Sequence, residues 1–338
     1  MAMIRIAAEE AWAPKEILDR YRKLLQEKPE SWDPGFRSLW GFFLGSSERA
    51  TLLARRIQDL GPQRIADMDA SGIAKQLILL SSPGVQVFDA PEAVALARDM
   101  NDQLIAHLSD RFAGLAAIAP QDPAAAVKEL QRAVKLGLKG AVVNSHTQGA
   151  YLDDPKCWEI FEAAQALDVP IYIHPNTPPR EMIGPFLPRG LDGAIYGFAV
   201  ETGLHLMRII VAGVFDRFPK LKVVVGHLGE GLPFWLFRID FMHAAMVRAQ
   251  RYAGVGPLKM KVSDYFKQNI WVTTSGMQWA PAIQFCISVL GIERVMYAMD
   301  YPYQFVPDEV KVTDEMPMSD ADRKKLYQEN VEKVFRLR

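Results

Sequence analysis

Short apolar segments alternate with longer segments of helical periodicity along most of the chain. The apolar segments predict strands at residues 4–9, 76–81, 112–119, 140–144, 170–174, 223–227, 270–274 and 295–299. The periodic segments predict helices at residues 48–59, 64–69, 91–109, 123–136, 158–167, 205–217, 232–250, 281–290 and 320–334. The strands lack alternating polar residues, which is typical of parallel strands that helices cover. This order of strands and helices predicts an α/β protein with the architecture of a (β/α)8 TIM barrel.

Two long insertions interrupt the alternation. The first lies between the first strand and Glu48 and includes the aromatic-rich residues 32–43; the second covers residues 175–201 and is rich in proline and glycine. Each follows a strand, so both are expected at the C-terminal face of the barrel, where this fold builds its catalytic sites. They would form either a lid or wall over a substrate, or ordinary packed loops and oligomer contacts. No repeat or linker divides the chain, so residues 1–338 are expected to form one domain.

The composition argues against several classes of protein. The 338 residues carry 39 Lys+Arg against 40 Asp+Glu, which leaves a net charge of −1 and no electrostatic footprint for nucleic acid or a membrane surface. Cys157 and Cys286 stand alone in apolar helical segments and predict buried thiols of a reducing compartment. The chain has no signal-peptide pattern and no apolar run near the ~20 residues that cross a bilayer. We therefore expect a cytoplasmic protein without a nucleic-acid or membrane partner.

Acids and imidazoles are concentrated at the predicted carboxyl ends of the strands. Glu9 and Glu10 follow the first strand's apolar run, His174 and His227 end later strands, and Asp300 follows the last one. These ends converge on one axis in a barrel, so the side chains are expected to lie close together. A lone histidine there is usually a core residue, but two histidines with two carboxylates predict a site for Zn²⁺, Mn²⁺ or Fe²⁺. Adjacent strand residues face opposite sides, so only one of the two glutamates needs to face inward.

Three further residues are candidates for chemistry. Glu230 follows His227 by three residues, so its carboxylate can hold one ring nitrogen and tune the other as a proton shuttle, or it can be a charge at a helix N-terminus. Asp300 ends an apolar strand, where a carboxylate is costly to bury without a cation, and a structural ion pair is the alternative. Arg238 lies on the helix after His227 and would either bind a carboxylate or be a surface residue.

These motifs together resemble the metal-dependent amidohydrolase superfamily. Glu9-Glu10-Ala11 replaces the usual H-x-H of the first strand, and the fourth strand ends in Asn144 with no lysine to bridge two metals, so a binuclear hydrolase is disfavoured. The chain is most similar to the mononuclear, nonhydrolytic branch that contains the γ-resorcylate, 5-carboxyvanillate and aminocarboxymuconate semialdehyde decarboxylases, and among these to the 5-carboxyvanillate decarboxylases. The similar segments are 8–11, 38–42, 47–50, 64–69, 82–85, 144–149, 172–175, 225–227 and 296–304.

The resemblance implies roles for individual residues. Glu9, His174 and Asp300 would bind one divalent metal ion, manganese first and zinc next. His227 and Glu230 would form a proton-handling pair. The positions that match contacts to the aromatic acid are Arg49, Ser81 and Arg238, with Tyr303 as a further pocket residue.

One departure from the family concerns the substrate. Phe43 stands where the family has a tyrosine, and Ser81 stands where it has a threonine. The missing hydroxyl at Phe43 removes one hydrogen bond to the substrate. This change leaves the ring substituents open, but not the class of reaction.

The implied reaction is the nonoxidative decarboxylation of an ortho-hydroxy aromatic acid in aromatic catabolism, such as lignin degradation. The expected substrate is 5-carboxyvanillate, which would give vanillate and CO₂ after Asp300 protonates the ring carbon that bears the carboxylate. The alternatives are a decarboxylase of γ-resorcylate or 2,3-dihydroxybenzoate, a mononuclear lactone or amide hydrolase, and a barrel that binds without catalysis. The resemblance also implies a homo-oligomer, a dimer or larger.

Overall fold

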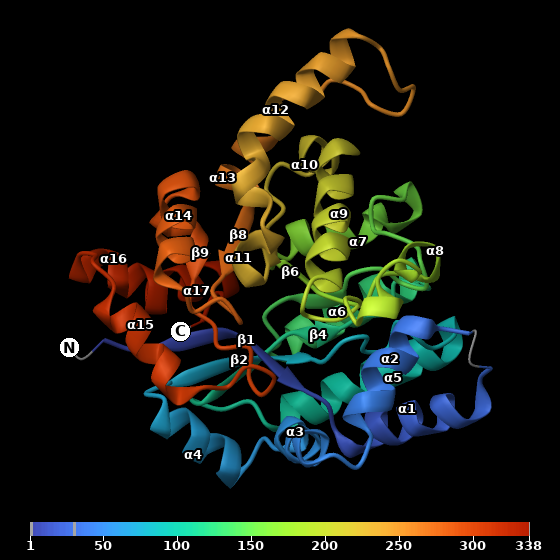
Figure 1. Cartoon of the computed structure of the whole chain (residues 1–338), viewed down its shortest axis with the longest axis vertical. Coiled ribbons are helices and arrows are strands. Elements are labelled where there is room, and N and C mark those ends of the chain that lie inside the picture. Colours follow the sequence, from blue (N-terminus) through green and yellow to red (C-terminus); the bar gives the residue numbers. More distant parts are fainter. Residues whose placement is uncertain (1–2, 30–31, 338) are drawn as a thin grey trace.

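A ring of parallel strands lies at the centre of the molecule, with helices around it (Figure 1). The computed structural model describes residues 3–29 and 32–337. The strands are β1 (Ile6–Trp12), β2 (Lys75–Leu80), β3 (Phe112–Gly114), β4 (Ala116–Ala117), β5 (Ala141–Asn144), β6 (Ile171–His174), β7 (Val223–Val225), β8 (Ile270–Thr273) and β9 (Val295–Met296). Neighbouring strands pair in parallel, in the orders β1-β2-β3 and β4-β5-β6-β7-β8-β9.

Backbone hydrogen bonds close the two seams between these sheets. Only Leu115 separates β3 from β4, and its N–H donates to the carbonyl of Ile78 at 2.9 Å. At the other seam, Ala8 N–H donates to the carbonyl of Tyr297 at 2.9 Å, and Ala11 N–H donates to that of Tyr301 at 2.8 Å. The predicted strand at 112–119 is therefore one barrel strand with a break, and the predicted (β/α)8 barrel is confirmed.

The helices follow the predicted order, with short additional ones. They are α1 (Lys15–Glu27), α2 (Pro34–Phe43), α3 (Glu48–Gln58), α4 (Pro62–Ala70), α5 (Ala90–Ala106), α6 (Pro123–Lys135), α7 (Trp158–Ala166), α8 (Arg180–Ile183), α9 (Gly197–Val211), α10 (Val214–Arg217), α11 (His227–Glu230), α12 (Leu232–Arg248), α13 (Val262–Asn269), α14 (Ala280–Leu290), α15 (Val310–Glu315), α16 (Asp320–Lys324) and α17 (Asn330–Phe335). Several begin at a side chain that accepts a hydrogen bond from the third residue on, such as Asp89 from Glu92 N and Asp122 from Ala125 N. None of the described helices is long and apolar enough to cross a membrane.

The structure differs from the sequence predictions in the insertions and at element ends. The first insertion is mostly helical, because α1 and α2 bury apolar residues such as Ile17 and Phe36. The first strand does not end at Glu9 but continues to Trp12, because Glu10, Ala11 and Trp12 still pair with β2. The helix predicted at 205–217 begins already at Gly197 and breaks at Gly213, which has φ +79°. Helix α13 was not predicted.

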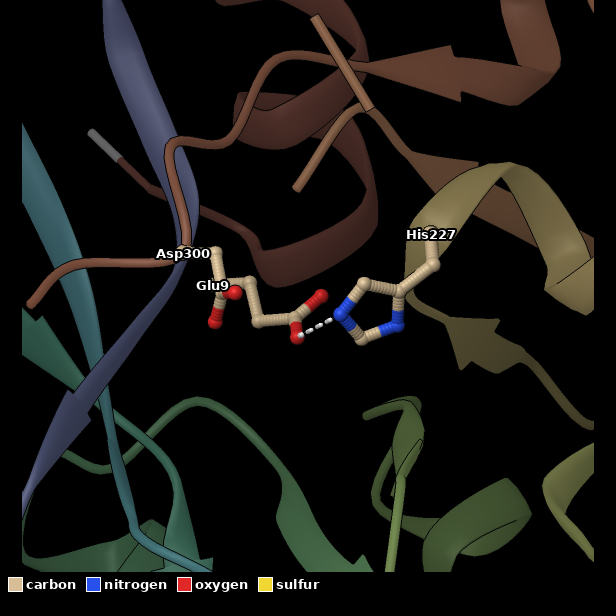
Figure 2. Close-up of side chains that lie close together, drawn as sticks. All are labelled: Glu9, His227 and Asp300. Atoms are coloured by element: carbon tan, nitrogen blue, oxygen red, sulfur yellow. Dashed lines mark ion pairs between the residues drawn. The ribbon is translucent and has the colours of Figure 1, made fainter. Parts of the chain in front are cut away.

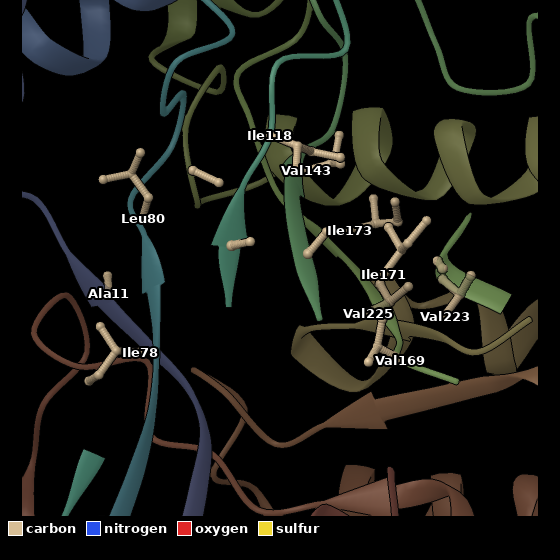
Figure 3. Close-up of a cluster of buried hydrophobic side chains, with 14 of the residues drawn as sticks. Ala11, Ile78, Leu80, Ile118, Val143, Val169, Ile171, Ile173, Val223 and Val225 are labelled. Atoms are coloured by element: carbon tan, nitrogen blue, oxygen red, sulfur yellow. The ribbon is translucent and has the colours of Figure 1, made fainter. Parts of the chain in front are cut away.

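Buried apolar side chains fill both faces of the ring. Ile171, Ile173, Val223 and Val225 belong to the cluster between strands and helices, part of which Figure 3 shows. Tyr172 and Val224, which lie between these residues along the strands, point the other way, into the barrel. There they join Ile6, Ala8, Leu77, Leu79 and Met296. The two cysteines are buried free thiols, as predicted.

Candidate active site

Three polar side chains meet at the carboxyl ends of the strands. Glu9 comes from β1, His227 begins α11 after β7, and Asp300 follows β9, and their potential ligand atoms lie within 4.8 Å of one another. Figure 2 shows the three side chains converging from separate elements. Among residues 3–29 and 32–337, no other group of three or more histidine, cysteine or acidic side chains has this geometry. The predicted convergence of strand ends is therefore present, but this group contains His227 where the ligand set implied by the resemblance has His174.

A β-bulge decides which of the two adjacent glutamates joins this group. Ile6 and Ala8 pack inside the barrel, so strict alternation would place Glu10 inside as well. The pairing of β1 with β2 shifts register between Ala7 and Glu10, and Glu9 therefore faces inward. Glu10 is fully buried on the other side. Only one of the pair faces the centre of the barrel, as expected.

Hydroxyl groups hold one oxygen of the Glu9 carboxylate. Its Oε2 accepts hydrogen bonds from the hydroxyls of Tyr172, Ser275 and, at 2.9 Å, Thr273. No role was predicted for these three residues. A signal was present, because Tyr172 lies two residues before His174 and Thr273 two before Ser275, and strand residues two apart share a face.

The other oxygen of Glu9 has no hydrogen-bond partner although it is buried. This Oε1 lies 3.6 Å from Nε2 of His174 and 3.7 Å from Nε2 of His227. A buried carboxylate oxygen in this state is costly unless a cation binds it. Imidazole nitrogens and carboxylate oxygens are ligands of zinc, manganese and iron, so the donor set fits a divalent ion of this class.

The two histidines present the same ring nitrogen to Glu9 but differ in protonation. Nδ1 of His174 contacts the carbonyl of Pro175 at 3.0 Å, whereas Nδ1 of His227 contacts Oε1 of Glu230 at 2.8 Å. Burial lowers the pKa of His174 to about 4, which favours a neutral ring. Burial also disfavours a charge on His227, but the carboxylates of Glu230 and Glu9 outweigh it and raise that pKa to about 10. His174 is therefore suited to bind a cation, and His227 is suited to carry a proton.

A left-handed turn brings His227 and Glu230 together. The φ angles of His227, Leu228, Gly229 and Glu230 are 49°, 55°, 77° and 55°. Residues other than glycine adopt this conformation at about 1–2 kcal/mol each, so the fold retains strain here to form the predicted pair. A Cβ at Gly226, just before the turn, would lie 2.5 Å from Oε2 of Glu9, so any larger residue there would have to displace that carboxylate.

Asp300 is suited to exchange a proton near neutral pH. Burial raises the pKa of its carboxyl to about 7; His227 opposes this rise, and the charges of Glu9 and Glu230 add to it. A group that gives up a proton during a reaction works best when its pKa lies close to the working pH.

A cavity of about 210 Å³ lies over these groups. Its lining residues are Leu39, Phe43, Arg49, Ser81, Ser82, His174, Pro175, Ala194, Phe198, His227, Asp300, Tyr303 and Gln304. Both insertions contribute to it, so they form walls of the cavity, which is one of the two roles considered for them. A larger hollow, of about 560 Å³, lies beside α6 and α17 at the opposite end of the barrel and contains none of these residues.

Four of the five residues predicted to contact a substrate line this cavity. The hydroxyls of Ser81 and Tyr303 are 2.6 Å apart, and the ring of Tyr303 lies 5.2 Å from that of Phe43. Arg49 donates to the backbone carbonyl of Tyr303 at 3.5 Å and makes no ion pair within the described part of the chain. Arg238 is exposed on α12 and is not among the lining residues. Its contact with a substrate stays a prediction.

A second buried polar cluster, which was not predicted, supports the cavity wall that contains Phe198. Helix α9 carries Phe198 on the cavity side and buries Glu201 and His205 completely. His205 contacts the hydroxyl of Ser145 through Nδ1 at 3.2 Å and accepts a hydrogen bond from Leu152 N at 3.1 Å. Burial raises the pKa of Glu201 to about 8, so its carboxyl is mostly protonated at neutral pH.

The protein is a (β/α)8 barrel whose strand ends carry side chains suited to bind a divalent metal ion. The chain belongs to the amidohydrolase family: the family model described as Amidohydrolase matches residues 57–337. The match confirms the resemblance to the amidohydrolase superfamily that the sequence motifs indicated.

Individual relatives in this family are decarboxylases. A 5-carboxyvanillate decarboxylase from Novosphingobium aromaticivorans, crystallised with manganese and 4-hydroxy-3-methoxy-5-nitrobenzoic acid, is 51% identical over 99% of this chain and 97% of its own, with a TM-score of 0.97. A dihydroxybenzoic acid decarboxylase from Polaromonas sp., crystallised with manganese and 2-nitroresorcinol, is 32% identical over 98% of this chain and 97% of its own, with a TM-score of 0.86. A γ-resorcylate decarboxylase from Polaromonas sp. is 36% identical over 84% of this chain and 90% of its own length.

Proposed function

We propose that this chain is a metal-dependent carboxy-lyase that removes CO₂, without oxidation, from an ortho-hydroxy aromatic acid, with 5-carboxyvanillate as the first candidate substrate. One observation carries the proposal: the unpartnered oxygen of Glu9 faces two imidazole nitrogens at the end of an aromatic-lined cavity. The named activities of relatives at 51%, 36% and 32% identity support the class of reaction.

The assignment of ligands follows from the state of each side chain. Glu9, His174 and Asp300 would hold one divalent ion, manganese first and zinc next. His174 is favoured over His227 as the nitrogen ligand because its ring is held neutral, whereas the Glu230 carboxylate holds the ring of His227 protonated. When bound, the ion would polarise the leaving carboxylate and the adjacent phenolic oxygen and orient them in the site.

The chain's own residues would then handle the proton. The carboxyl of Asp300 would donate its proton to the ring carbon that bears the carboxylate, which interrupts aromaticity and weakens the bond to that carboxylate. The electron pair of this bond would return to the ring as CO₂ leaves, which restores the aromatic system. His227, with Nδ1 held by Glu230 at 2.8 Å, would supply a proton to Asp300.

The cavity also suits a substrate with a second anionic group. Arg49 is an arginine on the cavity wall with no carboxylate partner among the described residues, so it could bind a carboxylate remote from the reacting one. The paired hydroxyls of Ser81 and Tyr303 would contact oxygen substituents, and Phe43 would pack against the ring.

The decisive experiment is CO₂ release from 5-carboxyvanillate by protein reconstituted with Mn²⁺. Metal-dependent release supports the proposal and makes Phe43 a tolerated change. With no release, γ-resorcylate and 2,3-dihydroxybenzoate become the next candidates, and γ-resorcylate is tested first because relatives named for that activity are 36% identical to this chain. Hydrolysis of a lactone or amide is tested only after these acids fail.

We further propose that the chain forms a homo-oligomer through α12. This helix extends away from the rest of the molecule in Figure 1 and exposes Phe234, Trp235 and Phe241, with Phe237 88% exposed. Several exposed aromatic side chains on one helix are typical of a protein interface. We expect Phe237→Glu to reduce the mass measured by light scattering, whereas the change of another exposed aromatic, Trp279→Glu, should leave it unchanged.

Arg238 belongs to the same exposed helix. Because it does not line the cavity of its own chain, its predicted contact with a substrate carboxylate requires a second copy. Arg238→Ala should then raise KM chiefly for substrates with two carboxylates. The Phe237→Glu variant should show the same rise in KM. Unchanged KM in both variants would remove Arg238 from the site.

A further inference from the structure

The backbone on either side of Asp300 is held by a single buried side chain. Glu10 is fully buried, and each of its carboxylate oxygens accepts a hydrogen bond from a main-chain amide. Met299 N–H donates to Oε1 at 2.9 Å, and Tyr301 N–H donates to Oε2 at 3.1 Å. One carboxylate therefore bridges the two residues that flank Asp300.

The bridged segment has an unfavourable backbone conformation. Asp300 has φ +69°, in the left-handed region that residues other than glycine avoid. Such a residue persists only where surrounding contacts determine its conformation. The two bonds to Glu10 fix the peptide unit before Met299 and the one after Asp300, so the segment that carries Asp300 is held at both ends and its carboxyl is directed towards Glu9 and His227.

Glu10 is itself held in place from the side of the helices. Gln76 donates to its Oε2 at 3.4 Å and accepts a hydrogen bond from Arg64 Nε at 2.6 Å. The buried guanidinium of Arg64 also donates to the carbonyl of Ala11 at 2.8 Å and lies 4.5 Å from the ring centroid of Tyr301. The arrangement thus joins β1, β2 and α4 to the segment after β9, and it leaves the carboxylate of Glu10 little freedom.

We propose that Glu10 is a positioning residue: its carboxylate holds Asp300 in the left-handed conformation that presents the Asp300 carboxyl to the metal-type centre and to the substrate. This role rests on the proposed function of Asp300 as ligand and proton donor. Glu10 does not touch the centre itself, because the β-bulge turns it to the opposite side of β1. The adjacent glutamates then have separate tasks, Glu9 at the centre and Glu10 behind Asp300.

Two substitutions test whether the length and the two acceptor oxygens of Glu10 position Asp300. Glu10→Asp keeps the carboxyl group but is one methylene shorter, so it cannot reach both amides. Glu10→Gln keeps the length of the side chain but replaces one acceptor oxygen with an NH₂ donor. That donor would face a main-chain N–H, so one of the two hydrogen bonds is lost. The control is Glu129→Gln, which changes another buried glutamate, on α6, that pairs with Arg132 and Asn101 and does not line the cavity.

The experiment measures three properties of Mn²⁺-loaded and metal-free protein. We expect both Glu10 variants to lose roughly 10- to 100-fold in kcat with KM changed less than about threefold, since misplacement of a reacting group by about 1 Å can cost 10²-fold. The electron paramagnetic resonance spectrum of bound Mn²⁺ should change in both variants. Crystals of metal-free Glu10→Asp should show Asp300 outside the left-handed region. Glu129→Gln should match the wild type in all three.

One outcome would overturn the proposal, and two others leave it to be decided by the remaining measurements. If Glu10→Asp matches the wild type in kcat, in spectrum and in the φ of Asp300, the bridge from Glu10 to the two amides does not position Asp300. If Glu10→Gln fails to fold, the Glu10→Asp variant alone tests this role. If the wild type releases no CO₂ from any of the acids above, the proposed function fails, and the crystallographic comparison of Asp300 still tests the role of Glu10.

Discussion

The charge of Arg49 allows a sharp test of how a substrate binds. Arg49 lies at the start of α3 and is exposed at the cavity rim, and among the described residues its side chain makes one hydrogen bond, to the carbonyl of Tyr303. A hydrogen bond between charged groups is worth about 1.5–3 kcal/mol when shielded from water, and exposed ion pairs are worth about 0–1 kcal/mol. For a residue at the rim we therefore expect about 1–2 kcal/mol for its contact with a carboxylate, which is roughly a 5- to 30-fold change in binding.

Product inhibition isolates this contact. Vanillate keeps the remote carboxylate that decarboxylation leaves behind, and 2-methoxyphenol is the same ring without it. In Arg49→Gln, the inhibition constant of vanillate should rise roughly 5- to 30-fold, whereas that of 2-methoxyphenol should change less than about twofold. The control is Arg55→Gln, which removes another exposed arginine of the same helix that is not among the cavity-lining residues.

The reasoning is refuted if Arg49→Gln weakens both inhibitors equally, since the loss would then be one of shape rather than of charge pairing. It is also refuted if neither constant changes. A loss of vanillate binding in Arg55→Gln would show that the effect comes from the general field of the helix rather than from a contact.

Four further outcomes are expected. Asp300→Asn should lower kcat on 5-carboxyvanillate by roughly 10²–10⁴-fold, and normal turnover would exclude Asp300 as the proton donor. Dialysis against a chelator should abolish CO₂ release and added Mn²⁺ should restore it; release that survives with no metal detected by elemental analysis would contradict the metal requirement. Gly226→Ala should reduce the metal bound per chain, because its Cβ would lie 2.5 Å from Oε2 of Glu9, and a full metal content would contradict the predicted clash. Glu201 has a pKa of about 8 in the fold against 4.5 as the ordinary value, so the folded state binds the extra proton between these values and the stability this carboxyl contributes falls as pH rises. The free energy of unfolding of the wild type, relative to Glu201→Gln in urea titrations, should therefore fall by about 1.4 kcal/mol per pH unit between pH 5 and 8, and a difference independent of pH would contradict the burial argument.

The barrel and the main residues of the site could be predicted from the pattern of apolar and polar residues along the chain. Apolar runs of strand length, separated by helical periodicity, are imposed by burial on both faces of each strand, so the order of elements is readable without the fold. His174, His227 and Asp300 stand directly after such runs, and in a parallel barrel that position alone implies convergence. The spacing of His227 and Glu230 likewise predicted a contact that exists at 2.8 Å.

Other features depend on contacts between residues far apart in the chain. The side chain of Glu9 faces the centre of the barrel only because the pairing of β1 with β2 shifts register there. The carboxylate of its neighbour Glu10 accepts hydrogen bonds from amides some 290 positions later in the chain. The helices of the first insertion are stabilised because apolar residues such as Ile17 and Phe36 are buried against the rest of the fold. The exposure of Arg238 on α12 likewise appears only when the helix is placed relative to the cavity.

The sequence by itself therefore determined the class of fold, the family, and the residue types at the strand ends, because burial and strand order act locally along the chain. Only the tertiary structure decided which carboxylate faces the centre, which oxygen of Glu9 lacks a partner, and which imidazole is held neutral. The physical reason is that hydrogen bonding, burial and charge pairing at one atom are set by groups that meet only when the barrel closes.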